Sequence, residues 1–295
     1  MERELLVAGS LPAVLTLPRR PSIGVVALHP ANGPSRDFPL FCHLATSLPP
    51  NRVAVLRYDR REPSSEGGEV SLRVQADDAI SAIGELRAAT STDLPVIVWG
   101  FSQGAWVAMI VAQSVRLAGI ALVGVSGVSP KEQMRYTSAR HLREAGFDEH
   151  AVAEMLKTRK LWEDSLRGIN VAGAQRELDF ASSQAWFPFA WLPTTIEPAA
   201  PEDDFEFEFD PTPLIRTLPC PLLAVVGDDD RWVPLPETIA VLETAPDVEL
   251  LHVPGGGHAP TEDGDGHGPP LPGYELGLID WRKRQTPTIR PRDLS

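Results

Sequence analysis

The chain has 295 residues, of which 43% are hydrophobic and 23% are charged. These proportions are typical of a globular protein, and the length fits one large domain with an insertion better than two equal domains. With 40 acidic and 27 basic residues, the formal net charge is −13 at pH 7. A chain of this charge repels the phosphate backbone, so we expect no nucleic acid among its partners.

The N-terminal residues MERELLVAGS lack the basic start and apolar centre of a secretory signal. No later stretch approaches the roughly 18 consecutive apolar residues of a transmembrane helix. The two cysteines, Cys42 and Cys220, lie far apart and form no CxxC pair, which argues against a disulfide framework and a zinc site. We therefore expect a soluble cytoplasmic protein with no membrane partner, in which both cysteines are buried.

Six short apolar runs predict strands, and they occupy residues 23–28, 53–57, 95–99, 119–125, 221–226 and 248–253. Near-continuous apolar runs of this length are typical of parallel strands that are covered on both faces. Between them, residues 72–89 and 103–115 carry apolar side chains at helical spacing. The alternation of strands and helices predicts an α/β fold with a doubly wound, mostly parallel sheet.

This alternation stops after residue 125, and roughly ninety residues pass before the next apolar run, which is more than one crossover helix needs. Residues 130–168 predict two or three amphipathic helices, with Gly146 ending one and Asp148 capping the next. We expect residues 129–210 to form a helical cap over the carboxyl edge of the sheet, where open α/β sheets bind ligands. Residues 1–128 and 211–295 then form the core.

Two further segments have weaker patterns. Residues 202–210 (EDDFEFEFD) alternate phenylalanine with carboxylates, which fits an edge strand or a cation site, although a solvated approach to the next strand is the favoured interpretation. The residues after Gln285 are rich in proline and arginine, and we expect order there only if they pack on the body of the protein.

The strand at residues 95–99 leads directly into residues 100–104 (GFSQG) and then into an apolar helix. A GxSxG pattern in this context predicts a nucleophile elbow, a sharp turn that raises Ser102 above the sheet. Side chains at Gly100 or Gly104 would collide with neighbouring elements. Ser102 is therefore the candidate nucleophile, at the start of a helix whose amides favour negative charge.

From residue 23 to about residue 284, the chain resembles the α/β-hydrolase superfamily, in which an acid and then a histidine follow the serine. Residues 227–234 (GDDDRWVP) are similar to the superfamily's GxxDxxVP pattern, which implies Asp230 as the acid. Residues 254–258 (PGGGH) resemble its histidine loop, which implies His258 as the base. The resemblance thus implies a catalytic triad of Ser102, Asp230 and His258.

Each of these residues has an alternative. Asp228, Asp229 and Asp230 could cap the helix that follows, and His267 in the segment GDGHGPP is a second candidate base. The other histidines are expected to be structural or exposed: His29, His43, His141, His150 and His252. Their spacing matches no metal site such as HExxH, so we expect neither a metal nor a cofactor.

Acyl transfer also needs donors for an oxyanion, and the resemblance implies the amide of Gln103 and a second amide from residues 29–34 (HPANGP). Many relatives have glycine after the histidine, whereas this chain has Pro30, which has no amide hydrogen. Ala31 is then the expected second donor, with Asn32 behind it. Residues 57–61 (RYDRR) resemble the superfamily's DxRGxGxS stretch, although Glu62, Pro63 and Ser64 replace its glycine-rich part. We expect a salt-bridged turn there that supports the elbow.

The resemblance implies a hydrolase of carboxylic esters that works through an acyl-serine intermediate. The predicted cap is rich in aromatic residues, which favours a small-molecule substrate with an apolar or aromatic group. These residues are Phe180, Trp186, Phe187, Phe189 and Trp191. The alternatives are a thioesterase, a serine peptidase, or a ligand-binding protein that keeps the fold without catalysis. A dehalogenase is excluded, because its chemistry needs a carboxylate at position 102.

Overall fold

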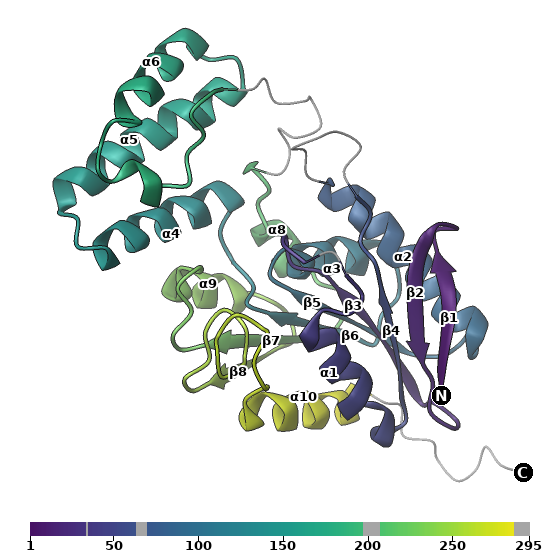
Figure 1. Ribbon diagram of the computed structural model, residues 1–295. Coiled ribbons are helices and arrows are strands. Elements are labelled where there is room, and N and C mark those ends of the chain that lie inside the picture. The colour runs from purple at the N-terminus through teal and green to yellow at the C-terminus, as the bar shows by residue number, and fades with distance from the viewer. Residues whose placement is uncertain (34, 63–69, 197–206, 286–295) are drawn as a thin grey trace, which may run out of the picture. The chain divides into compact units, whose positions relative to one another are not determined.

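The computed structural model describes residues 1–33, 35–62, 70–196 and 207–285. The chain forms two compact units (Figure 1). Unit 1 consists of Met1–Gly127, Pro211–Asp230 and Thr238–Ser295, and unit 2 of Val128–Asp210 and Arg231–Glu237. Residues 202–206 of the acidic stretch and the tail after Gln285 lie outside the described residues, as do Pro63 and Ser64.

Unit 1 is built on an eight-stranded sheet with the strand order β1-β2-β4-β3-β5-β6-β7-β8. The strands are β1 (Glu2–Val7), β2 (Leu11–Thr16), β3 (Ile23–Leu28), β4 (Val53–Tyr58), β5 (Val96–Phe101), β6 (Gly119–Val123), β7 (Leu222–Gly227) and β8 (Val248–Val253). Strands β3 to β8 pair in parallel, and β2 pairs antiparallel with both β1 and β4. The predicted α/β fold and its mostly parallel sheet are confirmed.

The hairpin of β1 and β2 was not among the predicted strands. Its turn contains Ala8 and Gly9, both with positive φ (49° and 73°). Alanine seldom adopts this conformation, so the turn carries only a weak sequence signal. In β2, every residue except Pro12 is buried.

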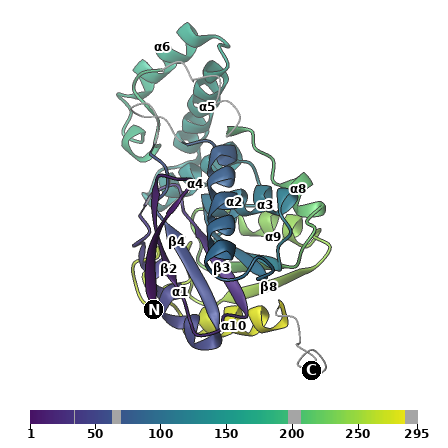
Figure 2. The same ribbon diagram turned by 90° about the vertical axis from the view of Figure 1, so that its right-hand side faces the viewer.

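Helices cover both faces of the sheet (Figures 1 and 2). On one face, α1 (Pro39–Ser47) and α10 (Pro272–Gln285) share an apolar core with alternate strand residues such as Val25, Ile97 and Val225. On the other, α2 (Leu72–Ala89) and α3 (Gln103–Ser114) pack against the strands. Successive strand residues point to opposite faces. A Cβ on Gly24 would accordingly meet Leu86 of α2, whereas Val25 lies in the first core.

The remaining helical segments of unit 1 are short. They are the 3-10 turn η1 (Pro49–Asn51), α8 (Thr212–Arg216) and α9 (Leu235–Leu242), whose first turn belongs to unit 2. Helix α2 begins after Ser71, whose side chain accepts a hydrogen bond from the amide of Val74. This cap fixes the start of α2 at the residue that the sequence predicted.

Unit 2 is helical and contains α4 (Pro130–Glu144), α5 (Glu149–Leu166), α6 (Val171–Ala181) and the 3-10 turn η2 (Phe187–Phe189). Gly146 follows α4 with φ of +88°, and the Asp148 carboxylate accepts a hydrogen bond from the amide of Ala151. The predicted helix end and helix cap are therefore confirmed. The unit has its own apolar core, which includes Leu142, Met155 and Leu178.

The two cysteines differ in burial. Cys220 is buried, and its burial, together with the charge of Asp247, raises the pKa of its thiol to about 11. Cys42 is only partly buried, so the expectation of two buried cysteines was wrong for it. Helix α1 buries Leu40, Phe41 and Leu44 instead. None of the described helices is both long and apolar enough to span a membrane.

A buried hydrogen bond joins the central strand β5 to α10. The Trp99 indole donates to the Tyr274 hydroxyl at 3.0 Å, and both side chains are buried. We expect Tyr274→Phe to lower the free energy of unfolding by about 1–3 kcal/mol, because it leaves the indole N–H unsatisfied in the core. Urea denaturation measures this change. In the control Leu276→Ala, at an exposed position of the same helix, the change should stay within about 0.5 kcal/mol. Equal effects would contradict the prediction.

Candidate active site

Ser102 lies between the last residue of β5 and the first residue of α3, with φ of 54° and ψ of −116°. A positive φ strains any residue other than glycine, and such strain persists only where the surroundings impose it. Here the Ser102 amide donates to the carbonyl of Val123 in the neighbouring strand at 2.9 Å. The turn that the GxSxG pattern predicts is present in this form.

The glycines on either side of Ser102 lie where backbones meet. A Cβ on Gly100 would lie 2.2 Å from the Gly104 carbonyl oxygen, and a Cβ on Gly104 would lie 2.6 Å from the Leu28 carbonyl oxygen. Backbone atoms cannot retreat as a flexible side chain can, so both positions require glycine, as expected. The second contact also brings the start of α3 against the end of β3.

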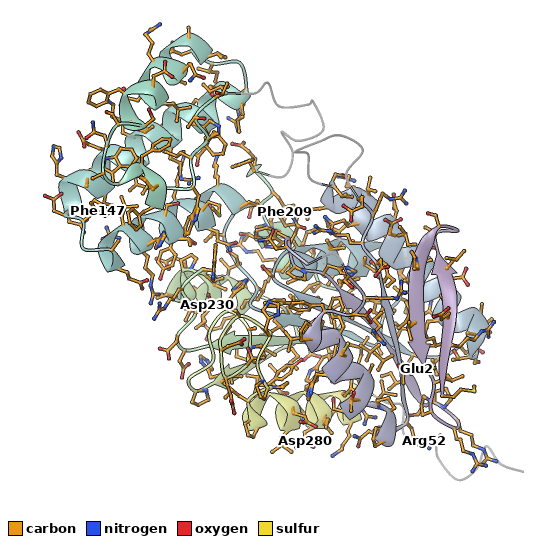
Figure 3. All side chains as sticks on the ribbon, in the orientation of Figure 1. Glu2, Arg52, Phe147, Phe209, Asp230 and Asp280 are labelled. Atoms are coloured by element: carbon orange, nitrogen blue, oxygen red, sulfur yellow. The ribbon has the colours of Figure 1, made fainter. Side chains whose placement is uncertain are left out.

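The sheet brings the three predicted triad residues together. Ser102 follows β5, Asp230 follows β7 and His258 follows β8, and these strands run in parallel, so their carboxyl ends share one edge. His258 Nε2 lies 2.9 Å from Ser102 Oγ, and His258 Nδ1 lies 3.0 Å from Asp230 Oδ2. Asp230 is labelled in Figure 3. A continuous hydrogen-bonded chain therefore runs from the serine hydroxyl to the carboxylate.

The burial of Asp230 determines how this chain is polarised. The Asp230 side chain is 1% exposed and that of His258 is 12% exposed. A buried carboxylate accepts a hydrogen bond from Nδ1–H, which leaves Nε2 with a lone pair for the serine hydroxyl. In this tautomer the imidazole is oriented to take a proton from Ser102.

The three consecutive aspartates have different surroundings. Asp228 and Asp229 are exposed, whereas Asp230 is buried and hydrogen-bonds His258. Asp228 Oδ1 lies 3.6 Å from Nδ1 of the exposed His252. The Asp229 amide donates to the Gly256 carbonyl at 2.9 Å, which ties the acid turn to the histidine loop. The structure thus places the carboxylate selected by the GxxDxxVP spacing next to the imidazole.

His267 does not lie in the hydrogen-bonded chain with Ser102. It belongs to a loop arranged around Asp263, whose carboxylate accepts hydrogen bonds from the Thr261 hydroxyl and the amides of Asp265, Gly266 and His267. Burial alone would raise the pKa of Asp263, but these hydrogen bonds outweigh it and hold the pKa below its ordinary value. The His267 ring packs edge-on against Phe38.

Gly124 is a site residue that the sequence analysis missed. It follows β6 with φ of +56°, and a Cβ there would lie 2.4 Å from the carbonyl oxygen of His258 and 3.1 Å from its ring. The missing side chain makes room for the imidazole. The available signal was a glycine at the end of an otherwise apolar strand, which often marks a close approach of another backbone.

His29 anchors the loop that follows β3. It is buried, and its Nε2 lies 2.6 Å from the Tyr58 carbonyl oxygen at the end of β4. Burial lowers the pKa of His29 to about 3; the bond to Tyr58 opposes this shift, and the positive charge of Arg60 adds to it. The neutral ring donates its Nε2–H to Tyr58. The interpretation of His29 as structural agrees with this environment.

Ion pairs surround the same loop. Arg36 pairs with Asp59 at 2.6 Å, and Arg57 pairs with Asp37. Arg61 pairs with Asp78 of α2 at 2.7 Å. The predicted salt-bridged turn at residues 57–61 is therefore present, but these pairs connect it to the loop after β3 and to α2. The candidate oxyanion donors Ala31 and Asn32 lie in that loop, and Gln103 is the first residue of α3.

The other histidines are dispersed. His43 lies beside Glu275, His141 stacks on Trp191, and His150 is exposed. In the part of the chain that the structure describes, no group of three or more histidine, cysteine or acidic side chains is arranged to hold a metal ion.

A model of the Alpha/beta hydrolase family matches residues 25–267. The chain belongs to this family. The match begins within β3, extends past β8 and includes all three residues of the hydrogen-bonded chain. No curated protein sequence matches this α/β hydrolase significantly.

Solved structures with a similar fold include two esterases and a peptidase. A thermophilic esterase from Thermogutta terrifontis has a TM-score of 0.57 and 18% identity, covering 97% of this chain and 99% of that one. A carboxyl esterase from Bacillus coagulans has a TM-score of 0.61 and 18% identity, covering 97% and 98%. Proline iminopeptidase from Mycobacterium smegmatis has a TM-score of 0.58 and 14% identity, covering 97% and 99%. At these identities the similarity shows the α/β-hydrolase fold alone.

The depressed pKa of His29 predicts a loss of stability in acid. Below about pH 6.5 the unfolded chain protonates His29, whereas the folded protein resists protonation down to about pH 3. The free energy of unfolding therefore falls as the pH falls through this window. Between pH 7 and pH 5, wild type should lose about 2 kcal/mol more than His29→Gln. Urea denaturation at both pH values measures the difference, and parallel pH dependence of the two proteins would refute it.

Proposed function

We propose that this α/β hydrolase is a serine hydrolase that cleaves carboxylic esters through an acyl-serine intermediate. The observation that carries the proposal is the hydrogen-bonded chain from Ser102 Oγ through His258 to the buried carboxylate of Asp230. A serine hydroxyl is a weak nucleophile until a base removes its proton. The strained backbone at Ser102 supports the same role, because strain of this kind clusters at functional sites.

In the proposed reaction, His258 Nε2 takes the proton of Ser102 while Oγ attacks the ester carbonyl carbon. Asp230 stabilises the imidazolium that forms. The amide of Gln103 and an amide of the loop after β3, from Ala31 or Asn32, stabilise the negative charge on the former carbonyl oxygen. His258 then protonates the departing alcohol. In the second half, His258 deprotonates a water molecule that attacks the acyl group, and Ser102 is regenerated.

We further propose that unit 2 acts as a cap that selects the substrate. Within this unit, Trp191 stacks between His141 and Trp232, with ring centroids 4.6 Å and 5.5 Å away. Trp191 is 42% exposed and Trp232 is 38% exposed. Exposed aromatic surface of this kind supports an ester with an apolar or aromatic group, since binding sites for small molecules are lined mainly by such side chains.

The nucleophile assignment is tested with Ser102→Ala. We expect its turnover of esters to fall at least ~10³-fold while its thermal unfolding stays unchanged, because the hydroxyl is the reacting group. The control Ser114→Ala, at an exposed position of α3, should keep wild-type turnover.

The substrate class is tested with an ester, a thioester and an anilide that carry the same acyl group, because their relative turnover separates an esterase from a thioesterase and a peptidase. Folded wild type that hydrolyses none of them and is not labelled at Ser102 by a fluorophosphonate would instead be a ligand-binding protein.

The acid is tested at the three consecutive aspartates. Asp230→Asn should lower turnover by on the order of 10⁴ with a normal fold, because an amide no longer holds the correct tautomer of His258 or stabilises its protonated form. Asp228→Asn and Asp229→Asn remove exposed carboxylates and should keep most of the activity. Steady-state kinetics and thermal unfolding of the three variants provide the comparison. A large loss at Asp228 or Asp229 would contradict the assignment of Asp230.

A further inference from the structure

We propose that Arg60 is a positioning residue that assembles the oxyanion hole by holding the loop after β3 and the Gln103 side chain with one guanidinium group. The inference rests on the proposed acyl transfer at Ser102. It concerns a residue that occupies the variable position of the stretch resembling DxRGxGxS, where Asp59 and Arg61 match the fixed positions.

Arg60 bonds both sides of the proposed hole. Its Nη1 donates to the Pro30 carbonyl oxygen at 2.9 Å and its Nη2 to the Ala31 carbonyl oxygen at 2.6 Å. The same Nη1 lies 3.2 Å from the Gln103 Oε1. Gln103 follows the nucleophile directly, so Arg60 connects the loop after β3 to the start of α3.

These bonds set the direction of the candidate donors. In a planar trans peptide, the carbonyl of one residue and the N–H of the next point in opposite directions. Since the carbonyls of Pro30 and Ala31 both point at Arg60, the N–H groups of Ala31 and Asn32 both point away from it. Two successive amides on one side of the backbone form a concavity that binds anions. Arg60 thereby orients the amides of both Ala31 and Asn32, the two candidate donors in this loop.

The loop has few other restraints at this point. His29 and Arg36 anchor its two ends through Tyr58 and Asp59. At residues 30–33, which follow the first anchor, the hydrogen bonds found among the described residues all come from Arg60, whereas Ser35 next to the second anchor bonds the amides of Asp37 and Phe38. In the same described part, the amides of Ala31 and Asn32 donate to no protein acceptor, which leaves both available to a ligand oxygen.

The side chain of Gln103 is held on its other side as well. Gln75 Nε2 lies 3.2 Å from Gln103 Oε1 and 2.6 Å from the Val70 carbonyl oxygen. Gln103 and Gln75 are both buried. The amide oxygen of Gln103 thus accepts from two donors that come from different elements, and Arg60 is the one that also bonds the loop.

A guanidinium group suits this task better than an ammonium group. Its planar fork presents several N–H donors at fixed angles, so it can bond three acceptors at once, whereas the ammonium of lysine is a compact point charge. Arg60→Lys therefore keeps the positive charge but loses the fork. This difference separates geometric positioning from a general effect of charge.

The test compares Arg60→Ala and Arg60→Lys with the matched control Arg61→Ala, using the best ester of wild type. Loss of one oxyanion donor costs about 10²–10³-fold in kcat. We therefore expect kcat to fall about 10–100-fold in Arg60→Ala, with KM within about 3-fold of wild type, because misdirected amides fail mainly in the transition state. Arg60→Lys should also lose kcat while unfolding at the wild-type temperature. Arg61→Ala leaves the buried Asp78 without its ion pair and should lose stability but keep kcat.

Two further measurements distinguish positioning from a structural role. Inhibition by a trifluoromethyl ketone, which forms an oxyanion on the serine, should weaken in Arg60→Ala by the same factor as kcat. Added guanidinium at millimolar concentration should restore part of the kcat of Arg60→Ala. A kcat unchanged in both Arg60 variants, or one that falls equally in Arg61→Ala, would overturn the proposal. If the proposed function itself is wrong, the wild-type protein will neither hydrolyse an ester nor react at Ser102, and this outcome is distinct from any effect of the Arg60 variants.

Discussion

The strained turn at Ser102 is the constraint on which the rest of the site depends. A serine with φ of 54° is held there because β5 ends on one side, α3 begins on the other, and the Val123 carbonyl fixes the amide between them. Close backbone contacts at Gly100 and Gly104 leave no space for the turn to relax. The strain costs on the order of 1–3 kcal/mol, which a well-packed sheet is able to offset. The strained turn places the Ser102 hydroxyl at the carboxyl edge of the sheet, at the start of α3.

The partners of Ser102 reach it because parallel strands end at one edge. The strand order places β3 and β6 on either side of β5, and the chain reverses its direction of travel across the sheet between β3 and β5. Such a switch point is where open α/β sheets bind ligands. The loops after β7 and β8 therefore begin at the same edge of the sheet as Ser102. Gly124 makes room for the His258 ring, and the Asp263 carboxylate accepts hydrogen bonds from Thr261 and Gly266 in the loop that follows His258.

Charge is arranged differently on the two sides of the serine. On the side of β7 and β8, a buried carboxylate faces the imidazole. On the side of β3 and β4, Arg57 and Arg60 bond the loop after β3, through Asp37 and the Pro30 carbonyl. Arg61 pairs with Asp78 of α2. In the proposed reaction, negative charge that develops on a substrate oxygen would meet amides oriented by Arg60, while positive charge on His258 would meet Asp230. This separation of charge suits acyl transfer.

The sequence by itself determined the six parallel strands, helices α2 and α3, the elbow, and which of three aspartates lies beside His258. Each of these depends on local signals: apolar runs, helical spacing, and glycines at fixed distances from one functional residue. Only the tertiary structure revealed the space that Gly124 leaves for His258, the antiparallel pairing of β2 with β4, and the bonds from Arg60 to Pro30 and Ala31. These features join residues far apart in the chain, and the direction in which a backbone amide points is fixed by contacts that no local pattern encodes.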